Sequence, residues 1–131
     1  MANGVSSALE DELLRQAAAA YPREACGLLL GEGERIDLVQ PCANIHTQPE
    51  NFFEIDPRAL VDAHRAARRG GPQVVGYYHS HPGGPPEPSA TDRASGTGDG
   101  RVWAIVGEGT VSWWRDTAEG FAPLSYPAAR G

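Results

Sequence analysis

Residues 74–92 read VVGYYHSHPGGPPEPSATD: an apolar run that ends in two histidines, a loop rich in proline and glycine, and a polar segment that ends in an acid. The run from Gln73 to His79 predicts a buried strand at the centre of a sheet. Alternate residues of a strand point to the same face, so His79 and His81 can direct both imidazoles at one ion. This stretch therefore predicts the central strand of the fold and a metal site at its end.

The third ligand of this metal site is expected from the segment that follows the loop. A catalytic zinc ion usually takes three protein ligands and keeps its fourth position for water. Asp92 is the nearest carboxylate that the loop returns to the histidines, and Glu87 is its local rival. The segment Ser89-Ala-Thr-Asp92 also has the pattern of a helix N-terminus, in which a hydroxyl caps the helix and an acid follows three residues later. Each pattern alone is common, and the prediction of a metal site depends on their conjunction.

Two helices and several strands are predicted around the central strand. Ser6 or Ser7 can cap a helix over Ala8–Ala20, and Asp56-Pro57 starts a second helix that runs to about Arg69. Cys26–Leu30 and Arg35–Gln40 are expected to pair as antiparallel strands around a turn at Gly31–Gly33, and further strands are expected at Asn51–Ile55, Val102–Val106, Val111–Arg115 and Phe121–Ser125. Two helices beside a mostly antiparallel sheet indicate an α+β fold or a three-layer α/β sandwich.

Composition and charge narrow the class of protein. The 131 residues suffice for a single domain, which we expect to span residues 1–131. No apolar run is long enough to cross a membrane, and the first residues lack the pattern of a secretory signal, so we expect a cytoplasmic protein. The net charge of −6 disfavours a nucleic-acid partner, because such binding needs clustered basic side chains. Cys26 and Cys42 are expected to be buried, reduced thiols, with a metal or redox role as the minority interpretation.

Glu24 is the candidate general base. It lies far upstream of the histidines, in the segment PREACGLLLG at residues 22–31. A zinc ion lowers the pKa of its bound water and polarises a carbonyl, so a nearby carboxylate can take the proton of the water and pass it to a leaving amine. The hydroxyl of Ser89 can donate a hydrogen bond to the oxyanion, in addition to capping a helix. These residue types indicate hydrolysis of a peptide or isopeptide bond without a covalent intermediate.

The same residues resemble the JAMM metalloproteases, also called the MPN-plus or Mov34 family. The family pattern is Glu, H-x-H, seven residues, Ser, two residues and Asp, which Glu24, His79, His81, Ser89 and Asp92 fill. The resemblance extends to PREACGLLLG, to FEIDP at 53–57 and to GYYHSHP at 76–82. It implies that the two histidines and Asp92 bind Zn²⁺, that Glu24 is the general base and acid, and that Ser89 helps to hold the oxyanion. The implied fold is an α/β/α sandwich with a curved, mixed, largely antiparallel sheet, similar to that of cytidine deaminases.

The resemblance also implies a class of substrate. Family members cut the bond after a C-terminal Gly-Gly of ubiquitin or ubiquitin-like proteins, and short bacterial relatives are associated with β-grasp sulfur-carrier proteins. The chain has little room for the long insertions with which eukaryotic deubiquitinases hold a second ubiquitin, so we expect a carrier protein of the bacterial class as the substrate. A homodimer is compatible with the sequence. The loop at residues 82–88 is richer in proline and glycine than the family pattern requires.

Two other functions are compatible with this resemblance. One is a catalytically silent protein-binding or scaffold domain, but silent relatives typically lose a ligand or the glutamate, and this sequence retains all of them. The other is a zinc deaminase. Such enzymes carry H-x-E and P-C-x-x-C patterns, which do not occur in the sequence.

Overall fold

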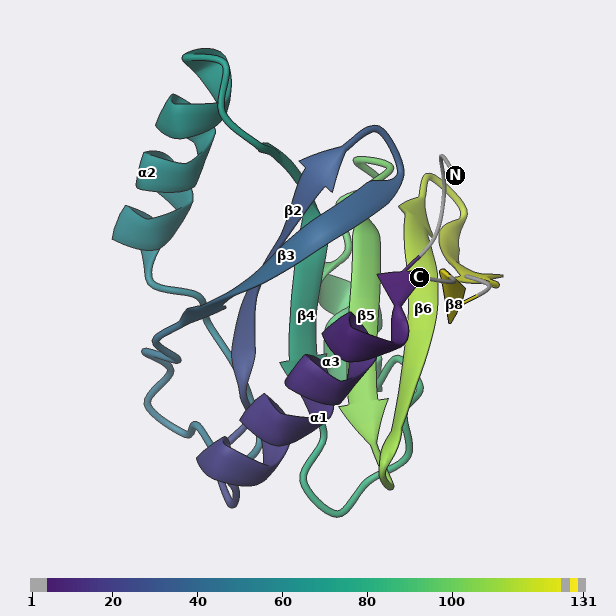
Figure 1. The fold of residues 1–131 in the computed structure, drawn as a ribbon. Coiled ribbons are helices and arrows are strands. Elements are labelled where there is room, and N and C mark those ends of the chain that lie inside the picture. Colours follow the sequence, from purple (N-terminus) through teal and green to yellow (C-terminus); the bar gives the residue numbers. More distant parts are fainter. Residues whose placement is uncertain (1–4, 126–127, 130–131) are drawn as a thin grey trace.

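The computed structural model describes residues 5–125 and 128–129 and is organised around an open, six-stranded sheet (Figure 1). The strand order is β3-β2-β4-β5-β6-β7, so β4 lies inside the sheet, as the apolar run predicts. Strands β4 and β5 run parallel, and the other neighbouring pairs in this sheet are antiparallel. The strands are β2 (Cys26–Glu32), β3 (Arg35–Cys42), β4 (Gln73–Ser80), β5 (Val102–Gly107), β6 (Thr110–Thr117) and β7 (Gly120–Leu124). A separate parallel pair joins β1 (Val5–Ser6) to β8 (Ala128–Ala129).

Helices cover both faces of the six-stranded sheet. On one face α1 (Ser7–Ala20) packs its Leu13 into a core that includes Leu29 and Tyr78. Side chains alternate along a strand, so Leu28 faces the other side, where α2 (Pro57–Arg68) covers it. The short helix α3 (Ala90–Ser95) lies on that same side, behind the sheet in Figure 1. Strands β2 and β3 run obliquely to β4, β5 and β6 in the figure. The predicted α/β/α sandwich with a curved, mixed, largely antiparallel sheet is therefore confirmed.

Local signals explain the limits of α2. The side chain of Asp56 accepts a hydrogen bond from the backbone N–H of Arg58 at 3.0 Å, and Pro57 occupies the first turn, where a missing N–H costs nothing. The helix ends before Gly70, whose φ of 93° is a conformation that glycine adopts without strain. The predicted cap of α1 by Ser6 or Ser7 lies outside the side chains that the structure describes.

Two predicted elements differ in the structure. The segment Asn51–Ile55 is not a strand, and it makes only an isolated bridge between Ile55 and Asn44. The β2–β3 turn lies at residues 33–34 rather than at Gly31–Gly33, because β2 continues to Glu32 through a register shift between Leu30 and Gly31. Among the described residues, no helix is long and apolar enough to cross a membrane.

Candidate metal centre

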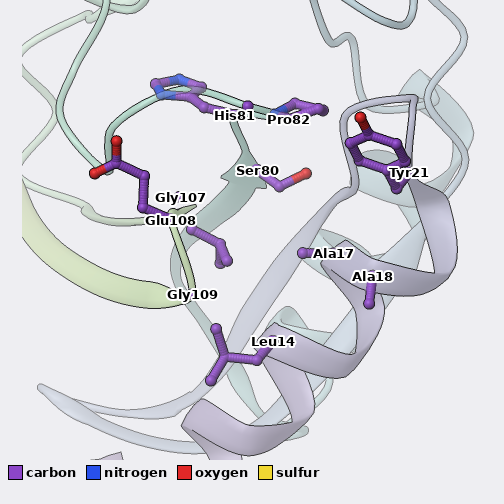
Figure 2. A pocket seen from close by; sticks show the side chains of 12 residues that line it. Leu14, Ala17, Ala18, Tyr21, Ser80, His81, Pro82, Gly107, Glu108 and Gly109 are labelled. Carbon is purple, nitrogen blue, oxygen red and sulfur yellow. The ribbon is translucent and has the colours of Figure 1, made fainter.

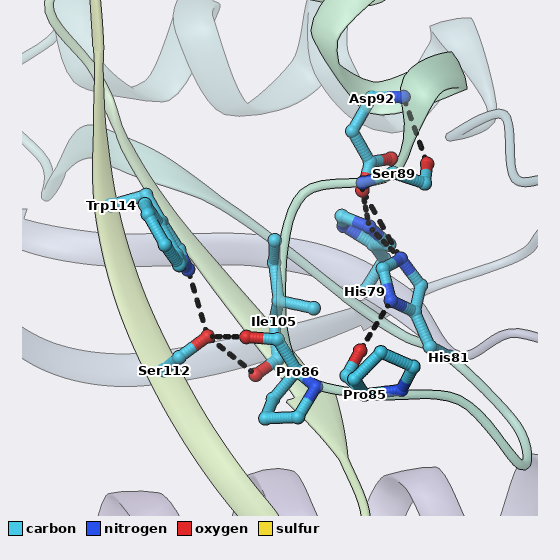
Figure 3. A network of polar contacts seen from close by, with 9 residues as sticks. All are labelled: His79, His81, Pro85, Pro86, Ser89, Asp92, Ile105, Ser112 and Trp114. Atoms are coloured by element: carbon cyan, nitrogen blue, oxygen red, sulfur yellow. Dashed lines mark hydrogen bonds and ion pairs between the residues drawn. The ribbon is translucent and has the colours of Figure 1, made fainter. Parts of the chain in front are cut away.

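The side chains of His79, His81 and Asp92 converge on one point at the end of β4 (Figure 3). The Nε2 atoms of the two histidines are 3.1 Å apart, and they lie 3.0 Å and 3.1 Å from Oδ2 of Asp92. Tetrahedral coordination at about 2.0–2.1 Å would separate its ligands by about 3.3–3.4 Å. The three atoms therefore form a triangle close to the size that a zinc ion requires. Among the described residues this is the group of acid, histidine and cysteine side chains that can hold a metal ion.

The proton positions in this triangle favour a cation. Nδ1 of His81 lies 2.9 Å from the carbonyl oxygen of Pro85, and a carbonyl oxygen only accepts, so Nδ1 carries the proton of the neutral ring. Nε2 of His81 then presents a lone pair to the carboxylate of Asp92 and to Nε2 of His79. Lone pairs that face one another at these distances are stabilised by a positive ion between them. The residues present therefore fit a bound Zn²⁺ ion.

The pKa values of His79 and Asp92 agree with metal binding. For His81, burial lowers the pKa, but the contacts with Asp92 and Pro85 outweigh burial and raise it, so a cation must compete with a proton at this ring. Burial raises the pKa of Asp92, but the close contacts of its carboxylate with the His79 and His81 rings and with the N–H of Ser89 outweigh burial and hold this pKa well below its usual range. Burial lowers the pKa of His79, whose side chain is 0% exposed, and outweighs the attraction of Asp92. Near neutral pH the carboxylate is therefore charged and the His79 ring is neutral, which are the forms that bind a metal.

On the Nδ1 side, aromatic rings rather than a hydrogen bond hold the His79 ring in place. Phe53 stacks on the imidazole with ring centroids 4.3 Å apart and planes inclined by 16°, and Trp103 meets it edge to face at 5.6 Å. Nδ1 of His79 is buried and has no hydrogen-bond partner within the described part of the chain. Metal-binding histidines usually donate this second N–H to an oxygen, which fixes the orientation of the ring. Here packing against Phe53 and Trp103 does so.

The loop between the histidines and Asp92 is fastened to the β5–β6 hairpin (Figure 3). Oγ of Ser112 donates to the carbonyl oxygen of Pro86 and accepts a hydrogen bond from Nε1 of Trp114 at 2.8 Å. The loop also packs closely on Gly107, where a Cβ atom would lie 2.5 Å from the carbonyl oxygen of Gly84. Because the neighbouring carbonyl of Pro85 contacts Nδ1 of His81, the hairpin indirectly positions a candidate metal ligand. The sequence reasoning did not identify Ser112, since its partner lies 26 residues away.

Ser89 and Asp92 form the predicted capping box at the start of α3. The N–H of Asp92 donates to Oγ of Ser89, and the N–H of Ser89 donates to Oδ2 of Asp92, both at 3.0 Å. Oγ of Ser89 is the acceptor in this pair, so its own proton remains available to donate. The same residue can therefore cap the helix and point a donor at a substrate oxygen near the metal ligands.

Glu24 lies near the ligands. Cys26 of β2 pairs with His79, and residue 25 continues the ladder, because its N–H donates to Oγ of Ser80 at 2.8 Å and its carbonyl accepts from the N–H of Ser80 at 3.0 Å. Glu24 directly precedes this ladder, and the charges of His81 and Asp92 both act on its carboxylate. The residue is 7% exposed. Burial raises its pKa to about 7; His81 opposes this rise and the charge of Asp92 adds to it.

The alternative ligands do not join this group. Glu87 is exposed, and it is absent from the cluster that Asp92 completes. Cys26 and Cys42 are free thiols on paired strands, and burial raises the pKa of Cys26 to about 12. Cys26 is therefore protonated at neutral pH and is not a candidate ligand in this state.

Three cavities surround the centre. One of about 420 Å³ is lined by Glu24 and the end of α1, and another of about 420 Å³, largely apolar, is lined by Phe53 and Trp103. Figure 2 shows the third, of about 220 Å³, between α1 and the loops that carry His81 and Glu108. His79 and Asp92 are buried and His81 is partly buried; the smallest cavity is lined by His81, and the other two are lined by neighbours of the cluster.

Comparison with known proteins identifies the family of this chain. The family model described as prokaryotic homologs of the JAB domain matches residues 6–116. A Haloferax volcanii protein named desampylase is 36% identical over 114 residues, which cover 83% of this chain and 81% of that protein. A Thermus thermophilus protein named probable TtuB-protein conjugate cleaving protease is 41% identical over 80 residues, which cover 61% of this chain and 51% of that protein.

Solved structures have a similar fold. A protein from Desulfitobacterium hafniense has a TM-score of 0.83 and 26% identity, over 97% of this chain and 92% of that chain. A JAB1/MPN domain protein from Archaeoglobus fulgidus has a TM-score of 0.66 over 97% of this chain and 99% of that chain, and its 21% identity shows the fold alone. Since the family model spans most of the chain, this protein belongs to the prokaryotic homologs of the JAB domain, within the JAMM/MPN-plus proteins, and is a hydrolase.

Proposed function

We propose that this protein is a zinc-dependent peptidase or isopeptidase that hydrolyses the bond after the C-terminal Gly-Gly of a ubiquitin-like or sulfur-carrier protein. The observation that carries the proposal is the combination of a three-ligand triangle with a buried glutamate whose pKa is about 7. A carboxylate with this pKa can accept and release a proton near neutral pH. The names of the Haloferax and Thermus relatives, a desampylase and a conjugate cleaving protease, support a protein conjugate as the substrate.

Each residue of the candidate centre has one part in the proposed reaction. A zinc ion held by His79, His81 and Asp92 would lower the pKa of a water molecule and polarise the scissile carbonyl. Glu24 accepts the proton of the attacking water and then delivers it to the leaving amine. Ser89 donates its hydroxyl hydrogen to the oxygen that becomes negative in the tetrahedral state. Peptide hydrolysis thus proceeds by direct attack of water, without a bond between substrate and protein.

The burial of the ligands supports glycine at the bond that is cut. The exposed fractions of the side chains are 0% for His79, 13% for His81 and 5% for Asp92, so a substrate carbonyl must come close to the sheet to reach the ion. Glycine lets a backbone pass at this distance without a Cβ clash. An extended tail that forms backbone hydrogen bonds, as in β-strand addition, fits this requirement.

The proposal is tested with a β-grasp carrier protein extended beyond its Gly-Gly terminus. We expect purified protein to hold one zinc ion by elemental analysis and to cut after the second glycine, as identified by mass spectrometry. Glu24→Gln should keep the zinc ion and lose about 10²–10⁴-fold in rate, and a carrier with valine as its second glycine should resist cleavage. Equal cutting of unrelated unfolded peptides would contradict the specificity. A zinc-loaded protein that binds carriers without cutting any would favour a silent binding domain.

A further inference from the structure

The loop at residues 43–56 connects β3 to α2 and forms one wall of the metal centre. Most of it is neither helix nor strand, so its backbone groups need partners outside a regular ladder. Several of these groups bind one side chain, that of Asn44, which is itself partly buried. One amide thus joins several parts of this wall, in addition to backbone hydrogen bonds such as that from Ile45 to Glu54.

The amide of Asn44 uses both its donor and its acceptor atoms. Nδ2 donates to the carbonyl oxygens of Glu24 at 3.1 Å, Phe52 at 3.0 Å and, more distantly, Pro49 at 3.4 Å. Oδ1 accepts from the N–H groups of His46 and Glu54, both at 3.1 Å. Every partner of Nδ2 is an acceptor and every partner of Oδ1 is a donor, so the orientation of the amide is determined by its surroundings.

One end of this network reaches the candidate base. Glu24 precedes β2, so the sheet ladder does not hold its own peptide groups. Instead its N–H donates to the carbonyl oxygen of Pro49 at 2.7 Å, and its carbonyl oxygen accepts from Asn44. The backbone of Glu24 is thus held on both sides by the loop.

The other end of the network reaches a metal ligand. The carbonyl of Phe52 and the N–H of Glu54 flank Phe53, and both bind Asn44. Phe53 in turn stacks on His79 at 4.3 Å, and among the described residues Nδ1 of that ring has no hydrogen-bond partner. A shift of the loop would therefore move the aromatic ring that holds this ligand.

We propose that Asn44 is a positioning residue that fixes Glu24 and the His79 ring relative to one another through a single side-chain amide. The role in turnover rests on the proposed function, because it assumes that Glu24 acts as the base. The role in metal retention requires only that His79, His81 and Asp92 bind zinc, since it runs through Phe53 and His79 and not through catalysis. The two parts can therefore be measured separately.

The test uses Asn44→Asp, with Asn51→Asp as the matched control on the same loop. Aspartate has nearly the shape of asparagine, but it turns a carboxylate oxygen toward the carbonyls of Glu24, Pro49 and Phe52. The side chain of Asn51 is exposed, so its replacement makes the same chemical change without this conflict. If Asn44→Asp does not fold, Asn44→Ser replaces it, because serine leaves space rather than a charge. Measurements are kcat and KM on the extended carrier, and the rate at which a chelator removes zinc.

For Asn44→Asp we expect kcat to fall by about 10- to 100-fold with KM little changed, because a misplaced base slows chemistry rather than binding. We expect zinc release to become about 10-fold faster, as for other losses of support around a metal ligand. Asn51→Asp should match the wild type in both. Wild-type kcat and wild-type zinc release in a folded Asn44 variant would overturn the proposal. If the wild-type protein cuts no carrier, the proposed function fails, and the zinc-release rates alone decide the role of Asn44.

Discussion

Replacing Glu24 by glutamine is expected to stabilise the metal-free protein above neutral pH. Burial raises the pKa of this carboxyl group from its ordinary value of 4.5 to about 7, against the opposing effect of His81 and with the aid of Asp92. Each pH unit between the folded and unfolded pKa is worth about 1.4 kcal/mol, so the ionised carboxylate costs the folded protein about 3 kcal/mol. Glutamine has a similar shape and no charge, and it removes this cost.

The dependence on pH follows from where the proton is bound. The unfolded chain releases the proton of Glu24 near pH 4.5, and the folded protein releases it near pH 7. Between these values the folded protein binds the additional proton, so wild-type stability falls as pH rises through this window and the loss is complete above it. The stability advantage of Glu24→Gln should therefore be about 2–3 kcal/mol larger at pH 8 than at pH 5.

Urea denaturation of chelator-treated protein at the two pH values measures this difference. Glu119→Gln is the matched control, because it removes an exposed carboxylate and corrects for the change in net charge. A stability difference between Glu24→Gln and wild type that is the same at both pH values would refute the reasoning. It would also remove the basis for Glu24 as a base near neutral pH.

Three further substitutions test other parts of the centre. Asp92→Asn should abolish stoichiometric zinc binding, because it removes the negative charge that both histidines face. Elemental analysis measures the zinc content, and a full content in this variant would place the ion elsewhere. Ser89→Ala should lower kcat by about 10²–10³-fold and the free energy of unfolding by about 1 kcal/mol, and a loss of stability without loss of kcat would limit Ser89 to capping α3. Ser112→Ala should weaken zinc affinity by about 10-fold, measured by chelator competition, because it frees the loop that holds His81. An unchanged affinity would show that the loop keeps its place without this hydrogen bond.

The sequence alone predicted the features that depend on residues close together along the chain. The H-x-H pair, the capping box of Ser89 and Asp92, and the limits of α2 are each set within a few residues, and all were predicted. The convergence of His79, His81 and Asp92 was predicted for the same reason, since the three lie within fourteen residues. Their binding of zinc stays a prediction, as do the catalytic roles of Glu24 and Ser89.

The sequence alone did not predict features in which one side chain binds backbone groups that are far apart along the chain. Asn51–Ile55 has the composition of a strand, but the peptide groups on either side of Phe53 bind Asn44 rather than a neighbouring strand. No local pattern shows this, because the partners of Asn44 extend from Glu24 to Glu54. The β2–β3 turn was misplaced for a related reason: the register shift at Gly31 depends on pairing with β3.

The candidate ligands and the candidate base come from separate parts of the chain. His79, His81 and Asp92 belong to one continuous segment, from the end of β4 through the following loop into α3. Glu24 lies in the segment before β2, and its backbone is held by the 43–56 loop. Over evolutionary time, a lineage can therefore discard the base by one substitution and inherit the ion-binding segment intact. In this architecture, zinc content alone therefore does not show whether a related protein is catalytically active.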